Sequence, residues 1–514
     1  MKAADPQAHR GAIEVLGIID ALVGRSPEGW GVRELAEHLG ASRSTVNRVL
    51  ATLAEYRLAG QSSHGLYTVG PRLRVLAATL RRRHPLFAVA GPLLDALRDA
   101  TLATAVLSVS TPDPCRCTVL LCREPALPVR YTLTPGARLP TYAGAAGLAI
   151  LTQTGTADLP PELDPPTRSA ARTPDDVDAM LAEAERRGGV VSIGKHIPDA
   201  AGIARGFRID HAMAGSITVS RPRAEFDESR VDATLGLISQ AVEELTARLT
   251  HTGGRPSSAP ARRPPGLEPT LVGRVARLIT RLCTAAETAM TAVEPAAAVG
   301  ARSVAAERLV RAAGDFGLLS WGGDSVLRVG PALLGWAAAL GAGGDDRLDL
   351  AELAREELSR LADDTGETVG LAYFDGDRAR LVATVPGREA IRYVLQTDVD
   401  IPLYAGAIGK SILAYTPDLL ESIELVPYTE RTPVDKDALR VELKRIAERG
   451  WARGEGERIP EASGIAAPFF IDGRISGAVT VTVPRHRMDH SRADVITHAV
   501  RQVASRLTGL LSTW

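Results

Sequence analysis

The sequence predicts an α+β protein in which a winged helix-turn-helix and a domain with an antiparallel sheet form one unit that occurs twice in tandem. Three observations predict this fold class. Helix-period and strand-period apolar patterns both occur along the 514 residues. A short helix, a glycine and a second helix with a polar start follow one another near residue 40. Segments of the chain recur at a nearly constant distance, which is typical of duplicated domains.

The repeat can be followed residue by residue. Pro140–Gly147 returns as Pro402–Gly409, an offset of 262 residues, with six of the eight residues unchanged. Val69 and the Gly-Pro that follows it return at Val329, an offset of 260 residues. We therefore expect two units of about 250 residues, joined by a mobile linker at 251–267 that is rich in proline, glycine and serine.

A DNA-reading motif is predicted at the start of the chain. Val32–Leu39 forms a short helix, Gly40 ends it because glycine tolerates positive φ, and Ser42 caps a second helix running to about Tyr56. Leu58–Val69 reads as two short strands around a turn, which would be the wing. The start of a recognition helix and the wing are the parts that meet DNA. The candidate DNA contacts are Ser42, Arg43, Ser44, Thr45, Asn47, Arg48, Ser63, His64 and Tyr67.

Charge supports a reader in the first copy only. The net charge is −1, so attraction to nucleic acid must be local. Residues 1–84 hold 12 Lys and Arg against 7 Asp and Glu, whereas residues 266–340 hold 7 against 6. The second copy also offers only Arg302, Ser303 and Glu307 among alanines, so we expect it to be degenerate and structural. The alternative for the first copy is a helix-turn-helix used only for packing.

The larger domain of each unit presents a candidate ligand site. A strand in each copy carries two hydroxyl side chains at positions i and i+2, which place them on one face of the sheet. If the pair faces a cavity, it could bind an anionic or polar small molecule. If it faces solvent, it is only a row of exposed hydroxyl side chains on the sheet. Small residues before a helix allow either a ligand or close packing. The hydroxyl pairs are Thr218 with Ser220 and Thr480 with Thr482, and the small pairs are Gly144 with Ala145 and Gly406 with Ala407.

Other functional classes find less support. Four cysteines are too few for a disulfide scaffold, and three of them, Cys115, Cys117 and Cys122, lack a fourth metal ligand. We expect no metal, no cofactor, no membrane span and a cytoplasmic location. An enzyme would need a catalytic arrangement, and no triad or metal spacing emerges from the polar residues near position 200, which we interpret as surface or loop residues. Those residues are Ser192, His196, Asp199, Asp210 and His211.

At this point the sequence resembles the IclR family of bacterial regulators, and the resemblance covers the chain twice. It is carried by ordered motifs, namely Leu35–Leu50, Tyr67–Leu73, Pro402–Leu413, Glu448–Trp451 and Gly464–Thr482. The resemblance implies a winged helix-turn-helix, a linker helix and a GAF-like effector domain. It also implies a dimer on a palindromic operator, and a small organic or aromatic acid as effector.

The resemblance places the effector pocket at Gly406, Ala407, Gly464, Thr480 and Thr482, and in the first copy at Gly144, Ala145, Gly202, Thr218 and Ser220. Leu148 stands in the first copy where the second has Lys410, a departure that makes the second effector domain the more typical sensor. We expect a homodimer or a pseudo-dimer formed by one chain. The competing hypotheses are a ligand-binding co-regulator that contacts protein rather than DNA, and a small-molecule enzyme.

The resulting domain boundaries follow the repeat. They are a winged helix-turn-helix at 1–71, a linker helix at 72–84, an effector domain at 85–250, a flexible linker at 251–267, a degenerate winged helix-turn-helix at 268–332, a second linker helix at 333–349 and a second effector domain at 350–514.

Overall fold

The computed structural model describes residues 6–62, 64–209, 213–251, 270–284, 289–291, 304–321, 326–341, 346–388, 395–471 and 473–511. The chain divides into two compact units, Met1–Gly344 and Asp345–Trp514. The predicted linker lies outside the described residues, apart from the last residue of the helix that precedes it. Within the described part, no helix combines the length and the apolar character needed to span a bilayer.

The first unit begins with the predicted winged helix-turn-helix. Its elements are α1 (Pro6–Gly24), α2 (Val32–Leu39), α3 (Arg43–Glu55), β1 (Ala59–Gln61) and β2 (Tyr67–Val69). Gly40 ends α2 with a φ of 61°, and the side chain of Ser42 accepts a hydrogen bond from the N–H of Thr45 at 3.2 Å. Both features confirm the local prediction. Leu16, Ile19, Leu35 and Leu50 lie in the core that these helices share.

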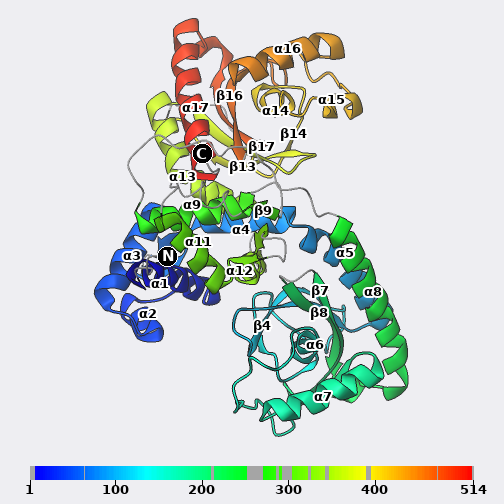
Figure 1. Ribbon diagram of the computed structural model, residues 1–514. Helices are drawn as coiled ribbons and strands as arrows, with labels where there is room; N and C mark the ends of the chain where they lie inside the picture. The colour runs from blue at the N-terminus through cyan, green and yellow to red at the C-terminus, as the bar shows by residue number, and fades with distance from the viewer. Residues whose placement is uncertain are drawn as a thin grey trace. The chain divides into compact units, whose positions relative to one another are not determined.

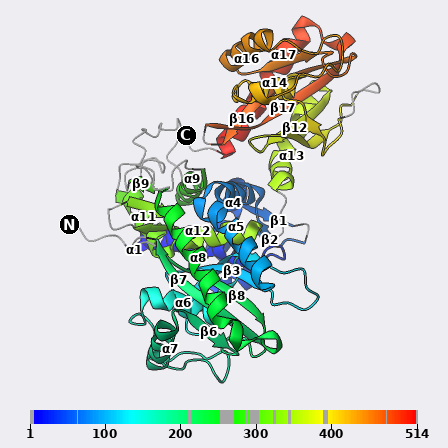
Figure 2. The same ribbon diagram turned by 90° about the vertical axis from the view of Figure 1, so that its right-hand side faces the viewer.

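The first effector domain is a curled sheet with helices on both faces. The strands run in the order β5-β4-β3-β8-β7-β6. In Figure 1, α6 lies inside the curl, while α5 and α8 lie side by side along the outer face, as they also do in Figure 2. The elements are α4 (Pro71–Arg83), α5 (Pro85–Thr101), β3 (Thr104–Ser110), β4 (Arg116–Arg123), β5 (Arg138–Pro140), α6 (Ala145–Thr154), α7 (Pro174–Arg187), β6 (Val190–Ile193), β7 (Ala200–Ile209), β8 (Met213–Pro222) and α8 (Val231–His251).

The first unit ends with the segment predicted to be the degenerate winged helix-turn-helix, of which the structure describes part. Its elements are α9 (Leu271–Thr284), β9 (Ala289–Thr291), α11 (Val304–Phe316), β10 (Leu319–Trp321), β11 (Val326–Val329) and α12 (Pro331–Gly341). Leu327 pairs with Met290 in its sheet, just as Tyr67 pairs with Trp30 in the first copy, 260 residues earlier. The predicted turn at Gly300, together with Arg302 and Ser303, lies outside the described residues, while Glu307 on α11 is exposed.

The two winged helix-turn-helix domains pack against each other within one chain. Helix α1 contacts α9, α11 and α12, and α4 contacts α9 and α12 (Figure 1). Arg81 donates a hydrogen bond at 2.6 Å to the carbonyl oxygen of Gly341, its own counterpart 260 residues later. Gly11 likewise lies against Leu271, its counterpart at the start of α9. Contacts between equivalent positions mark a pseudo-two-fold axis, so this part of the chain is a pseudo-dimer.

Polar contacts on either side of that axis differ between the copies. Between α4 and α9, the buried guanidinium of Arg72 donates to the hydroxyl of Thr280 at 3.1 Å. Between α1 and α12, the indole of Trp336 donates to the carboxylate of Asp20 at 2.8 Å. Burial lowers the pKa of Arg72 to about 10, because little water reaches its charge.

The second unit is an effector domain built like the first. Its sheet runs β14-β13-β12-β17-β16-β15, which repeats the order of the first sheet strand for strand and is consistent with the duplication.

Glu367, fully buried, accepts hydrogen bonds at 2.7 Å from Arg487 and from Arg492. The elements are α13 (Asp346–Thr365), β12 (Thr368–Phe374), β13 (Ala379–Val385), β14 (Asp400–Ile401), α14 (Ala407–Leu413), α15 (Leu419–Ser422), α16 (Lys436–Arg449), β15 (Ala452–Glu455), β16 (Ala462–Ile471), β17 (Arg474–Pro484) and α17 (His490–Leu511).

The contact between Arg72 and Thr280 gives a prediction for stability. Thr280→Val keeps the shape of the side chain but removes the acceptor, leaving a buried cation short of a partner. We expect a loss of about 1–3 kcal/mol in the opening free energy of α4 and α9, measured by hydrogen exchange. Thr284→Val is the matched control, because the Thr284 hydroxyl bonds only within its own helix. An equal loss in both variants would contradict the role given to Arg72.

Candidate functional site

The polar start of α3 lies on the surface, and the opposite side of the same helix is buried. Ser42, Arg43, Ser44, Asn47 and Arg48 are exposed and Thr45 is half-buried. The buried side consists of Val46, Val49, Leu50 and Leu53. The helix is therefore held by its apolar stripe while its polar edge stays accessible, the arrangement that groove entry requires.

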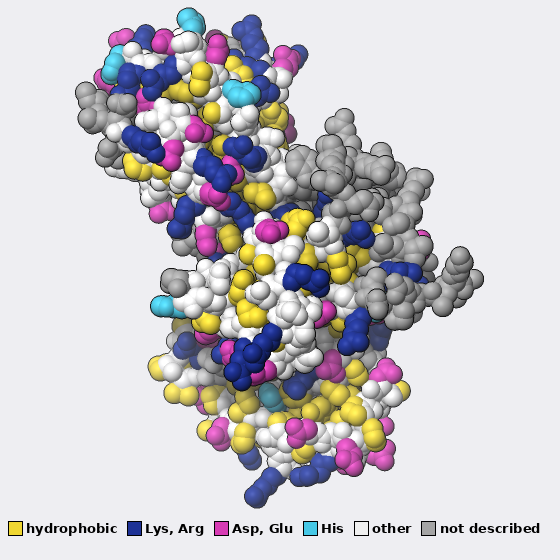
Figure 3. Space-filling model, turned by 90° about the vertical axis from the view of Figure 1, so that its left-hand side faces the viewer, with side chains coloured by type: hydrophobic (Ala, Val, Ile, Leu, Met, Phe, Trp, Pro, Cys, Tyr) yellow, Lys and Arg dark blue, Asp and Glu magenta, His cyan; other side chains and the backbone are white. Residues whose placement is uncertain are grey.

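The wing corrects one predicted contact. His64 is exposed at its tip, and Ser63 lies outside the described residues. Tyr67, predicted to contact DNA, is only 8% exposed, and its N–H and C=O each bond to Trp30 at 2.8 Å. Alternation along β2 points this side chain into the core, so packing is its role. On the face seen in Figure 3, basic and acidic side chains are interspersed, in keeping with the near-zero net charge.

Each effector domain holds a cavity between its sheet and the start of a helix. The first contains about 480 Å³ of empty space, open mouth included, and the second about 520 Å³. The predicted pocket residues gather there as expected. In the first cavity these are Gly144, Ala145, Gly202, Thr218 and Ser220, and in the second Gly406, Ala407, Gly464, Thr480 and Thr482.

The two cavities differ in how much space surrounds the glycine on the strand that faces the helix start, Gly202 in the first and Gly464 in the second. A Cβ at Gly202 would lie 3.1 Å from Cβ of Ala145, a tight contact, so this glycine allows close packing. A Cβ at Gly464 would have its nearest neighbour at 3.6 Å, an ordinary contact. Gly144 and Gly406 begin their helices with φ of 82° and 87°, a conformation that side chains disfavour.

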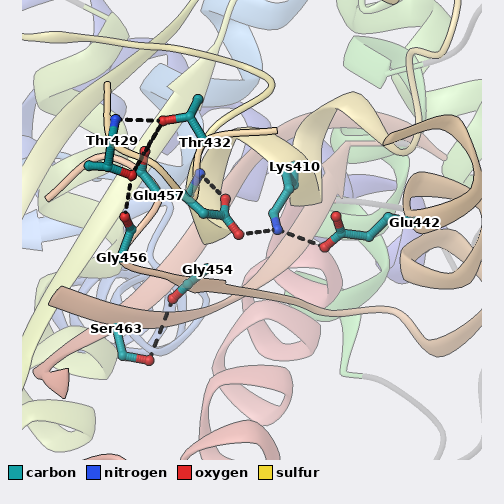
Figure 4. A network of polar contacts seen from close by, with 9 residues as sticks. Lys410, Thr429, Thr432, Glu442, Gly454, Gly456, Glu457 and Ser463 are labelled. Carbon is teal, nitrogen blue, oxygen red and sulfur yellow. Dashed lines mark hydrogen bonds and ion pairs between the residues drawn. The ribbon is translucent and has the colours of Figure 1, made fainter. Parts of the chain in front are cut away.

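A buried lysine organises the wall of the second cavity (Figure 4). Lys410, 1% exposed, contacts Glu457 at 2.5 Å and Glu442 at 2.6 Å. The other oxygen of the Glu457 carboxylate accepts a hydrogen bond from the N–H of Gly406 at 2.7 Å. The backbone oxygen of Glu457 is held by the hydroxyl of Thr432 at 2.6 Å. The lysine therefore fixes a carboxylate at the start of α14.

Sequence reasoning missed part of the first cavity. Ser192 and His196 were interpreted as surface or loop residues, but Ser192 is buried on β6, and the loop carrying His196 folds over the cavity together with Lys195. Only the alignment of the copies could have shown it, since Arg458 and Glu457 occupy the same two places in the second cavity. Asp199 is exposed, and Asp210 and His211 lie outside the described residues.

The cysteines form no metal centre in the part of the chain that the structure describes, where no group of His, Cys, Asp and Glu fits a metal ion. Cys117 and Cys122 lie on β4 and Cys115 just before it. Burial raises the pKa of Cys117 to about 12, which leaves its thiol protonated and unreactive.

The buried lysine gives a second prediction. Lys410→Leu strands two carboxylates, and we expect it to destabilise the second unit by about 3–5 kcal/mol. Leu148, Met180 and Lys195 hold the equivalent positions in the first copy, without an ion pair among them. The triple variant Lys410→Leu/Glu442→Met/Glu457→Lys should therefore recover most of the loss. Hydrogen exchange of α14 and α16 in the full chain measures the loss in the single variant and the recovery in the triple variant. A triple variant as unstable as Lys410→Leu would refute the idea that the unpaired carboxylates cause the loss.

Comparison with known proteins identifies both parts. The IclR helix-turn-helix domain family matches residues 15–63, and the family described as bacterial transcriptional regulator IclR C-terminal matches residues 345–508. The chain is 33% identical to the HTH-type transcriptional regulator BhcR of Paracoccus denitrificans over 32% of its own length and 60% of that protein's length. It therefore spans less than two thirds of this relative.

A longer match is found in Mycobacterium tuberculosis. The HTH-type transcriptional regulator Rv1719 is 30% identical over 44% of this chain and 86% of its own length. Among solved structures, a putative IclR regulator from Silicibacter sp. is 23% identical, covering 46% of this chain and 96% of its own, with a TM-score of 0.39. With two family matches and a relative aligned over most of its length, the chain belongs to the IclR family of bacterial transcriptional regulators.

Proposed function

We propose that the protein is a DNA-binding transcriptional regulator whose α3 reads an operator and whose wing tip, at His64, lies along the phosphate backbone. The observation that carries this proposal is the bare polar edge of α3 from Ser42 to Arg48. Arg43 and Arg48 supply donors that suit guanine or phosphate, and Asn47 suits adenine. Such a protein acts where the chromosome is, which in a bacterium is the cytoplasm.

The effector domains would sense a small molecule and change the affinity for DNA. Each cavity combines apolar walls with a few polar groups, as ligand sites commonly do. In the first copy the ligand contacts are Gly144, Ala145, Thr218 and Ser220, with Gly202 as a close-packed wall, and in the second they are Gly406, Ala407, Gly464, Thr480 and Thr482. A small organic or aromatic acid is the effector class that these sites would take.

One chain already supplies two helices in the place of recognition helices, as a palindrome-binding dimer needs, and of these the polar edge of α3 carries the better reading chemistry among the described residues. The described face of α11 exposes Glu307, which phosphate would repel. We therefore assign one competent reader to each chain and two chains to a palindromic operator. A footprint confined to one half-site for two bound chains would refute this stoichiometry.

The proposal is tested by removing two guanidinium groups from the exposed edge. Arg43→Ala/Arg48→Ala should weaken binding to chromosomal fragments that the native protein retains by about 100-fold, because each contact is worth about 1–3 kcal/mol. It should also flatten the dependence of affinity on salt. Quantitative gel retardation at several salt concentrations measures both effects.

Arg311→Ala is the matched control, since Arg311 is an exposed arginine on α11, the equivalent helix of the second copy. It should leave DNA affinity within about twofold. If the double variant retains DNA like the native protein, the first winged helix is a scaffold and the co-regulator hypothesis is favoured. Turnover assays on the molecules that bind the cavities would test the enzyme hypothesis.

A further inference from the structure

The two effector cavities differ most at the place where a helix begins. In the second cavity the chain's own carboxylate, that of Glu457, accepts the N–H of Gly406 at 2.7 Å. The start of a helix attracts negative charge, because its first N–H groups have no partner within the helix. This position in the second cavity is thus already filled by an internal anion, and Lys410 holds that anion in place.

The first cavity has lost all three members of that cluster. At the positions 262 residues earlier stand Leu148, Met180 and Lys195. Leu148 is buried and Met180 packs against the same apolar group. The carboxylate is therefore replaced by an ammonium group, and among the described residues no side chain accepts a hydrogen bond from the N–H of Gly144 as Glu457 does from that of Gly406.

Lys195 borders both the first effector cavity and a neighbouring hollow whose wall includes Asp176, Glu183 and Glu228, and of the two the effector cavity is the one without a carboxylate in its described lining. The cavity lining includes Lys195 and His196, and no Asp or Glu among its described residues. No described residue accepts a hydrogen bond from the ammonium of Lys195, and half-burial lowers its pKa from the ordinary value. Arg116 lies near enough to lower the pKa of His196 further. An anion entering this space would meet attraction from the lysine and from the helix start.

The first cavity also holds polar atoms that lack partners. Thr218 is 3% exposed, and its hydroxyl has no hydrogen-bond partner. Nδ1 of His196 is likewise buried and unpaired. In the second cavity the equivalent hydroxyl, that of Thr480, donates to the carbonyl oxygen of Ile465 at 3.0 Å. Leaving a buried hydroxyl unpaired destabilises the empty cavity, and a ligand oxygen would supply the missing hydrogen-bond partner.

We propose that the first effector domain is the anion sensor of this chain. It takes a compact organic carboxylate, with the carboxylate group between Lys195 and the start of α6 and a second oxygen at the hydroxyl of Thr218. Glu457 already occupies the equivalent place in the second domain, so the proposal narrows the acid site of the proposed regulatory function to the first cavity. This inference rests on the proposed regulatory function, but it reverses the division of labour that the sequence suggested, in which the second domain was the more typical sensor.

The test is calorimetric titration of the full chain with lactate, pyruvate, benzoate and 4-hydroxybenzoate, each beside its neutral amide. At least one acid should bind with one site per chain and at least tenfold more tightly than its amide. Lys195→Gln should lower the affinity of the chain for that acid at least tenfold while leaving the thermal unfolding temperature unchanged. Glu442→Gln is the matched control, because it removes a charge beside the second cavity. It should leave the affinity for the acid unchanged. Failure of all four acids, equal binding of acid and amide, or full binding by Lys195→Gln would overturn the inference.

Exchanging the clusters gives an independent check. Leu148→Lys/Met180→Glu/Lys195→Glu should fill the first site with an internal anion and abolish acid binding. The reverse triple exchange at 410, 442 and 457 should open the second site and raise the stoichiometry to two. If the acid still binds the first exchange variant as before, Lys195 is not the anion partner and the proposal fails.

DNA affinity separates this inference from the regulatory function. If an acid binds through Lys195 but leaves DNA affinity unchanged, the anion site stands and the sensor function fails. If DNA affinity responds to an acid that Lys195→Gln binds normally, the sensor function stands and the anion site fails.

Discussion

The packing of two winged helix-turn-helix domains within one chain is the constraint on which the first unit depends. Helices α1 and α9 meet at equivalent positions, and α4 and α12 flank them, so the recognition helices have fixed places relative to each other. The interface is mostly apolar, and polar contacts such as Arg72 with Thr280 and Trp336 with Asp20 lie on either side of its axis. Loosening either contact would disturb the reader and the linker helices together.

Much of this fold could be predicted from the residues, because local chemistry decided it. The glycine at 40 and the serine at 42 set the end of one helix and the start of the next, and the recurring segments predicted two units of one fold, with which the equal strand orders of the two sheets are consistent. Tyr67 was misplaced because strand alternation over three residues cannot show which face is covered. Ser192 was misread because it lies buried on β6, whereas His196 does lie in a loop, and what the sequence could not show is that this loop folds over the cavity.

The two effector cavities show how one backbone frame can carry opposite electrostatics. Both place a glycine of positive φ before a helix and a pair of hydroxyl side chains on the facing strand. The differences include one lining position, Glu457 in the second cavity and Lys195 in the first, and two positions behind it, where Lys410 and Glu442 are exchanged for Leu148 and Met180. Because a buried ion cluster is costly when incomplete, its members are expected to change together rather than singly.

The unequal contacts on either side of the pseudo-two-fold axis have a further consequence. In a homodimer every interface substitution occurs twice, so each side chain must suit its mate in both places at once. Here Asp20 faces Trp336, whereas the equivalent position, Thr280, faces Arg72. In two domains joined within one chain, a substitution occurs in one copy only. The residues on the two sides of the interface can therefore differ. One half can then keep its contact with nucleic acid while the other half serves only as its permanent support.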